Sequence, residues 1–172
     1  GTRAGNSQQT PGGHPPQRLF VGAETCMQHP YFKPIIGAFL DRAVCAQFHR
    51  MGVVMEKHYL RLEYIVDRHG FYLEPHKDIG EKTLTMQIYL GDAPEHCGTD
   101  IYDNDLNYVK TLSFKHNHGY CFIPGDDTWH GLESKDIPKA RCSLIINYVS
   151  FVTDWAVPFT HAELSAQEAA MA

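Results

Sequence analysis

The sequence predicts a mainly β domain, built as a sandwich or jelly roll and supported by one or two helices near its N-terminus. From about residue 60 onward, apolar and polar residues alternate in short stretches, and Gly, Pro or Asp residues end each stretch. Before that point, apolar residues between positions 32 and 44 recur at the three- and four-residue spacing of a helix. The length of 172 residues fits one domain with a single core.

The alternation places about eight strands in the core of this domain. They are expected at residues 60–66, 71–78, 84–90, 99–102, 109–114, 119–123, 128–132 and 142–151. A short apolar stretch at residues 18–22 is expected to add an edge strand. One helix is expected over residues 31–52, because Pro34 fits early in a helix and Gly52 fits at its end.

These elements define a single domain at residues 18–160, with its core at residues 60–151. Residues 1–17 are rich in Gly, Pro, Gln and Ser, and we expect them to be flexible because they offer little apolar surface to bury. Residues 161–172 form a C-terminal tail, either a short helix or a frayed end.

Composition excludes several classes of function. The net charge of −5 argues against a broad nucleic-acid interface, which needs a surplus of basic residues. No apolar run approaches the roughly 20 residues that cross a bilayer. The five cysteines lack CxxC spacing and are odd in number, which indicates reduced thiols in a cytoplasmic protein. Oligomeric state is not encoded in any pattern that we recognise.

A metal-binding pattern stands out within the strands. His76 and Asp78 are two residues apart, so both side chains point to the same face of an extended strand, and His130 follows on a later strand. Two imidazoles and one carboxylate are the facial triad that holds Fe(II) and leaves coordination positions open. The pair His116 and His118 is the competing candidate, but it precedes a turn and is more typical of a solvated loop.

A second pattern suggests an anion site beside the metal. Arg141 follows His130 on the next strand and offers a rigid fork of donors to a carboxylate, and Ser143 points the same way. The segments that carry all these residues are LRLEYIVDRHGFYLEPHKDIG (60–80), KTLTMQIYLGD (82–92), CGTDIYDN (97–104), GYCFIPGDDTWHGLE (119–133) and RCSLIINYV (141–149).

In these segments, which cover about half of the chain, the sequence resembles the Fe(II)/2-oxoglutarate-dependent oxygenases, and among them the prolyl-hydroxylase-like branch. The resemblance implies a double-stranded β-helix in which His76, Asp78 and His130 bind Fe(II). It also implies that the protein uses O₂ and 2-oxoglutarate to hydroxylate an unactivated C–H bond, with release of succinate and CO₂.

The resemblance assigns the remaining site residues. Arg141 would pair with the far carboxylate of 2-oxoglutarate, with Ser143 and Tyr89 as hydroxyl donors. Thr85 and Tyr64 are further candidates for co-substrate contact. For both tyrosines, core packing with a satisfied hydroxyl remains the alternative interpretation.

Substrate contacts are expected from Asn147, Gln87 and Tyr72. The prolyl-hydroxylase-like branch often has a bulky aromatic where this chain has Asn147, so a prolyl-peptide substrate is in doubt. A small or amino-acid-like molecule fits better than a protein side chain, although no motif identifies it. Two other functions stay open, a cupin-type metalloenzyme that does not use 2-oxoglutarate and a non-catalytic jelly-roll binding module.

Overall fold

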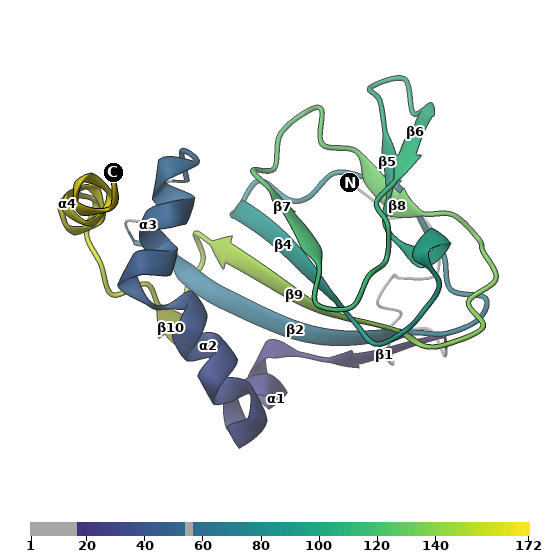
Figure 1. The fold of residues 1–172 in the computed structure, drawn as a ribbon, viewed down its shortest axis with the longest axis horizontal. Coiled ribbons are helices and arrows are strands. Elements are labelled where there is room, and N and C mark those ends of the chain that lie inside the picture. The colour runs from purple at the N-terminus through teal and green to yellow at the C-terminus, as the bar shows by residue number, and fades with distance from the viewer. Residues whose placement is uncertain (1–16, 54–56) are drawn as a thin grey trace.

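The computed structural model describes residues 17–53 and 57–172, and in them the chain forms two antiparallel sheets that face each other (Figure 1). The larger sheet has the order β1 (Arg18–Val21), β2 (Tyr59–Asp67), β9 (Arg141–Val149), β4 (Lys82–Leu90) and β7 (Gly119–Phe122), and β10 (Trp155–Ala156) also pairs with β2. The smaller sheet has the order β3 (Leu73–His76), β8 (His130–Leu132), β5 (Asp100–Tyr102) and β6 (Tyr108–Thr111). This arrangement confirms the predicted mainly β jelly roll, a double-stranded β-helix.

Each strand expected between residues 60 and 151 is present, and the edge strand expected at residues 18–22 is β1. The short strand β10 was not predicted. The flexible segment expected at residues 1–17 lies outside the described residues, apart from Gln17.

The single helix expected at residues 31–52 is wrong, because the chain forms three consecutive helical pieces there. They are η1 (Pro30–Phe32), α2 (Lys33–Phe39) and α3 (Arg42–Arg50), and α1 (Ala23–Gln28) precedes them. The break falls at Asp41, whose backbone is extended and whose carboxylate accepts hydrogen bonds from the amides of Ala43 and Val44. Asp41 therefore caps the start of α3, and this cap outweighs the continuous apolar spacing across it.

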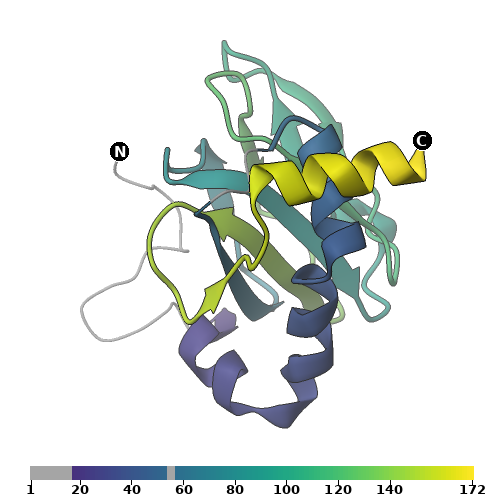
Figure 2. The ribbon, with the colours of Figure 1, turned by 90° about the vertical axis from the view of Figure 1, so that its left-hand side faces the viewer.

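The C-terminal tail is an ordered helix, α4 (His161–Met171). Thr160 and Glu163 form a capping box at its start, which satisfies amides that have no partner within the helix. Leu164 is fully buried, and the imidazole of His49 on α3 lies 3.2 Å from the Ser165 hydroxyl. Helix α4 therefore lies against α3 and belongs to the helical layer (Figure 2).

The two faces of the larger sheet differ in polarity. The outer face packs against the helices through fully buried apolar side chains such as Leu60, Leu62 and Ile146, each of which contributes about 1.5–3 kcal/mol by burial. The inner face, directed at the smaller sheet, buries polar and charged residues instead. These are Glu63, Asp67, Thr85, Gln87, Arg141, Ser143 and Asn147. Buried polar groups are costly unless they are bonded, so the inner face is where a functional site is expected.

None of the helices in the described parts of the chain has both the length and the apolar character that a membrane span requires.

Candidate metal and co-substrate site

His76 and His130 face each other across the smaller sheet. They are paired residues of β3 and β8, and their ring centroids lie 4.4 Å apart. The Nδ1 atom of His76 is 2.9 Å from the carbonyl oxygen of Glu74, and that of His130 is 3.0 Å from the carbonyl oxygen of Thr128. A carbonyl can only accept, so each Nδ1 carries a proton, and in the neutral ring the lone pair is on Nε2. This is the tautomer in which histidine binds a metal through Nε2.

Glycine at position 131 allows these two strands to approach. A Cβ atom at Gly131 would lie 2.6 Å from the carbonyl oxygen of Leu73 on β3, which is too close for any side chain. The residue next to His130 must therefore be glycine if β8 is to pair with β3 in this register.

Asp78 lies two residues beyond the end of β3, and its side chain is only 3% exposed. Its Oδ1 atom is 2.6 Å from Nζ of Lys82, and its Oδ2 atom accepts a 2.6 Å hydrogen bond from the Thr85 hydroxyl. Burial alone raises the pKa of the Asp78 carboxyl, but the charge of Lys82, the charge of His130 when its ring is protonated, and the two hydrogen bonds outweigh it and lower this pKa. Asp78 is therefore ionised, as a metal ligand must be.

The donors of the triad fit Fe(II) in chemical type, in tautomer and in charge. Within residues 17–53 and 57–172, however, no three His, Cys, Asp or Glu side chains are gathered closely enough to hold a metal ion. The two imidazoles lie together, whereas both oxygens of Asp78 are turned to Lys82 and Thr85. To bind one metal ion together with His76 and His130, Asp78 would have to give up or share its hydrogen bonds to Lys82 and Thr85.

Arg141 is almost fully buried, and it already has a carboxylate partner within the chain. Its Nη1 atom is 2.7 Å from Oδ2 of Asp67, and its other nitrogens donate to the carbonyl of Cys97 at 2.6 Å and to the hydroxyl of Thr99 at 3.1 Å. The same carboxylate accepts two hydrogen bonds from Arg18, from Nε to Oδ1 at 2.6 Å and from Nη2 to Oδ2 at 3.0 Å. Two guanidinium groups on one carboxylate leave this buried unit with a formal charge of +1. Sequence reasoning missed both Asp67 and Arg18.

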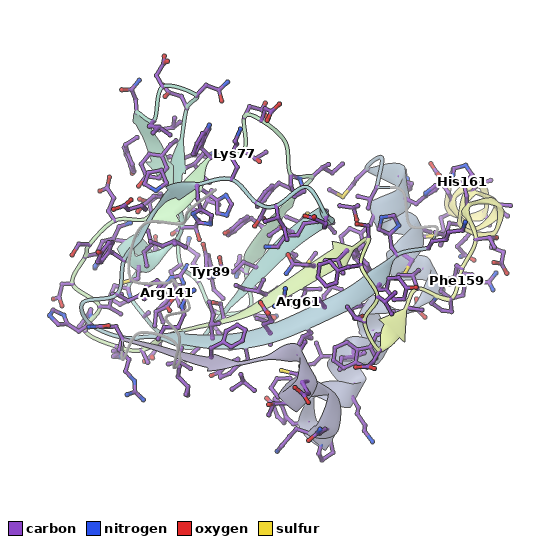
Figure 3. All side chains as sticks on the ribbon, turned by 180° about the vertical axis from the view of Figure 1, so that it is seen from behind. Arg61, Lys77, Tyr89, Arg141, Phe159 and His161 are labelled. Carbon is purple, nitrogen blue, oxygen red and sulfur yellow. The ribbon has the colours of Figure 1, made fainter. Side chains whose placement is uncertain are left out.

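A network of hydroxyl and amide groups adjoins Arg141 on the inner face. The Tyr89 hydroxyl donates to Thr99 at 3.0 Å, and the Gln87 amide donates to the Ser143 hydroxyl at 2.8 Å. The guanidinium of Arg141 lies over the Tyr89 ring, 5.5 Å from its centroid, and Figure 3 shows these two residues side by side between the sheets. The fold therefore brings together Arg141, Ser143 and Tyr89, the three main candidates for co-substrate contact. Thr99 and Tyr120 also belong to the network, and no pattern in the sequence singled them out.

Thr85, a further candidate for co-substrate contact, lies with Asn147 beside the candidate metal ligand Asp78 and not in the network around Arg141. Thr85 contacts Asp78 and lies 3.0 Å from Oδ1 of Asn147, its partner across β4 and β9. Asn147 is 1% exposed, and its Nδ2 has no hydrogen-bond partner in the described chain. The single proton of the Thr85 hydroxyl is bound most strongly by the Asp78 carboxylate. In either orientation of the amide, at least one polar atom of Asn147 is then left for a ligand.

Tyr64 requires a correction, because it lies on the opposite face of the larger sheet. It packs against Phe32 with ring centroids 6.4 Å apart, and a hydrogen bond with Cys142, together with burial, raises its pKa to about 12. On β2 it shares the face of Leu60 and Leu62, not that of Glu63, so it cannot reach a co-substrate inside the barrel.

Two other candidates lie outside the inner network. Tyr72 is 37% exposed on the connection between β2 and β3. His116 accepts a 3.0 Å hydrogen bond from the Gly91 amide, which agrees with its interpretation as part of an exposed loop.

The fold and this inner face define the class as a double-stranded β-helix with a polar interior. No family model matches the sequence, and no curated protein matches it. Among solved structures, an oxidoreductase of the 2OG-Fe(II) oxygenase family from Burkholderia pseudomallei matches with a TM-score of 0.58, 13% identity, and coverage of 72% of this chain and 58% of that one.

Two further structures match at comparable level. A viral collagen prolyl hydroxylase from Paramecium Bursaria Chlorella virus-1, in complex with 2OG, has a TM-score of 0.55 and 12% identity over 79% of this chain and 81% of its own. The non-heme alpha ketoglutarate dependent carbocyclase SnoK from nogalamycin biosynthesis has a TM-score of 0.55 and 14% identity over 87% of this chain and 70% of its own. At such low identities the likeness establishes a shared fold.

Proposed function

We propose that this protein is an Fe(II)- and 2-oxoglutarate-dependent dioxygenase that hydroxylates an unactivated C–H bond of a small or amino-acid-like substrate, with release of succinate and CO₂. The observation that carries the proposal is the pair of facing imidazoles. Both Nδ1 atoms are bonded to carbonyl oxygens, so both rings have the metal-binding tautomer, and an ionised carboxylate lies nearby. The fold, shared with oxygenases that use 2-oxoglutarate, supports it.

His76, His130 and Asp78 would hold Fe(II). When bound, Fe(II) supplies the oxidising chemistry that couples O₂ to decarboxylation of 2-oxoglutarate and to oxidation of the substrate. The task of this chain is to orient the three ligands. The carbonyls of Glu74 and Thr128 fix the two rings, and Thr85 fixes one oxygen of Asp78.

The neighbourhood of Arg141 would bind 2-oxoglutarate. A buried carboxylate needs a charged partner and hydrogen bonds, and the unit of Arg18, Asp67 and Arg141 carries one positive charge in excess. Three of the five N–H groups of Arg141 make the internal bonds described above, and the other two can donate to an anion. The Ser143 hydroxyl, which accepts from Gln87 and keeps its own proton to donate, would complete the contact, and the Tyr89 hydroxyl would join it by turning its single proton from Thr99 to the carboxylate.

A second candidate function has one observation in its favour. Because Asp67 already pairs with Arg141, the presence of Arg141 is explained without any co-substrate. A metalloenzyme on the same barrel that does not consume 2-oxoglutarate would fit this arrangement. The experiment below separates the two functions.

Anaerobic addition of Fe(II) and 2-oxoglutarate is expected to produce the weak visible charge-transfer band of the chelated co-substrate. Tyr89→Phe should raise the 2-oxoglutarate concentration at half-saturation about five- to tenfold, the equivalent of one hydrogen bond of about 1 kcal/mol. Tyr64→Phe is the matched control. It should leave the 2-oxoglutarate concentration at half-saturation unchanged, because Tyr64 lies on the other face of the sheet. Metal binding without a band at any 2-oxoglutarate concentration would favour the second function.

Asn147 is expected to contact the substrate and not 2-oxoglutarate. Asn147→Leu should leave half-saturation by 2-oxoglutarate within about twofold of wild type, because Asn147 lies beside Thr85 and away from Arg141. It should also lower the stimulation of succinate release by active compounds from a panel of amino acids and small metabolites. Undiminished stimulation in Asn147→Leu would remove this residue from the substrate site.

A further inference from the structure

Asp78 is neutralised by a cation from its own chain. The ammonium of Lys82 lies 2.6 Å from Oδ1, with the two side chains only 12% and 3% exposed. The Thr85 hydroxyl occupies the other oxygen at 2.6 Å. Both oxygens of Asp78, the proposed third metal ligand, are thus hydrogen-bonded to side chains of strand β4.

The backbone of β4 is built to bring Lys82 to this position. Lys82 and Thr85 are three residues apart, and in a regular strand two such side chains point to opposite faces. Here the pairing with β9 shifts between Lys82 and Leu84, so one extra residue enters the strand. Such a bulge redirects side chains, and it lets both residues reach Asp78. The backbone amide of Lys82 also donates a 3.1 Å hydrogen bond to the carbonyl oxygen of Ile79, which closes the turn after Asp78.

We propose that Lys82 is a built-in counter-cation for the metal site. It holds Asp78 in the metal-free protein, and it must leave or share this carboxylate before the third ligand can join His76 and His130. Lys82 therefore sets the metal affinity of the site and stabilises the metal-free fold. The inference rests on the proposed function, because it requires a metal at these three residues.

Two consequences distinguish this role from that of an ordinary salt bridge. An ammonium beside Asp78 repels an incoming divalent cation and competes with it for the same oxygen, so removing the charge should strengthen metal binding. The same removal should destabilise the metal-free protein, because it leaves Asp78 buried without its charged partner. A salt bridge that only orients Asp78 for the metal would give weaker metal binding when it is lost.

The test uses Mn(II), a divalent probe that needs neither O₂ nor 2-oxoglutarate, and measures its dissociation constant by calorimetry. Lys82→Met should bind Mn(II) about ten- to hundredfold more tightly than wild type, the range by which groups around metal ligands change affinity. Lys82→Arg keeps the charge and should stay near wild type. Lys77→Met is the matched control, because Lys77 lies inside the same motif but pairs with the exposed Asp126 at 3.1 Å.

Thermal unfolding provides a second readout, and Lys82→Gln a second variant if Lys82→Met folds poorly. The metal-free variants should unfold at lower temperature than wild type, and saturating Mn(II) should close or reverse this gap. Equal or weaker Mn(II) binding by both uncharged variants, while His130→Ala abolishes binding, would overturn the role of Lys82 and leave the proposed function intact. If no form binds Mn(II) in a way that depends on His130, the proposed function fails, and the inference fails with it.

Discussion

Asp67→Ala is expected to lower the free energy of unfolding by about 3–5 kcal/mol, the cost of removing one partner from a buried ion pair. The Asp67 side chain is fully buried, and its carboxylate neutralises two guanidinium groups that are themselves only 12% and 4% exposed. Without it, Arg18 and Arg141 would be like charges in a poorly solvated interior. Arg18 also lies 4.0 Å from the centroid of the Phe71 ring, so it has little freedom to move to solvent.

Denaturant unfolding of wild type, Asp67→Ala and Asp67→Asn measures this effect. Asp67→Asn keeps the shape of the side chain but removes the charge, so it should also be strongly destabilising. Asp92→Ala is the matched control, because Asp92 forms an exposed ion pair with Lys139 and its loss should change little. Equal stability of Asp67→Ala and Asp92→Ala would show that the buried unit does not hold the barrel together.

The strands were predictable because their signal is local. Alternation of apolar and polar residues fixes which face of a strand is buried, and it placed the core strands near their observed positions. The same rule groups Tyr89 with Gln87, and Arg141 with Ser143, on the inner face. It also groups Tyr64 with Leu60 and Leu62 on the outer face. The prediction that Tyr64 contacts the co-substrate was wrong because it rested on the family resemblance, whereas the alternation places Tyr64 on the outer face.

The missed features depend on contacts between distant parts of the chain. Asp67 bonds Arg18 and Arg141 across 49 and 74 residues, and no pattern in a single sequence pairs these positions. The placement of Lys82 on Asp78 depends on a shift of pairing with β9, which can be seen only when both strands are in place. The break before α3, in contrast, has a local signal in the sequence, because Asp41 is a good N-cap residue within an otherwise helical pattern.

His76→Ala and His130→Ala are each expected to reduce 2-oxoglutarate turnover, measured as succinate release, by about a hundredfold or more, since even groups behind metal ligands change metal affinity ten- to hundredfold. Both side chains lie at the partly exposed rim of the smaller sheet, so these variants should keep the unfolding midpoint of metal-free wild type. His116→Ala, in an exposed loop, is the matched control and should retain activity.

Asp78→Ala should differ from the histidine variants in one respect. It should lose activity equally, but it also leaves the ammonium of Lys82 at a 12% exposed position without its carboxylate, so it should lower the stability of the metal-free protein as well. We therefore expect the two histidine variants to lose activity and keep their stability, and Asp78→Ala to lose both activity and stability. This difference would show that Asp78 is the one ligand that pairs with a cation of its own chain when no metal is bound. Wild-type turnover in any of the three variants would remove that residue from the metal site, because a facial triad has no ligand to spare.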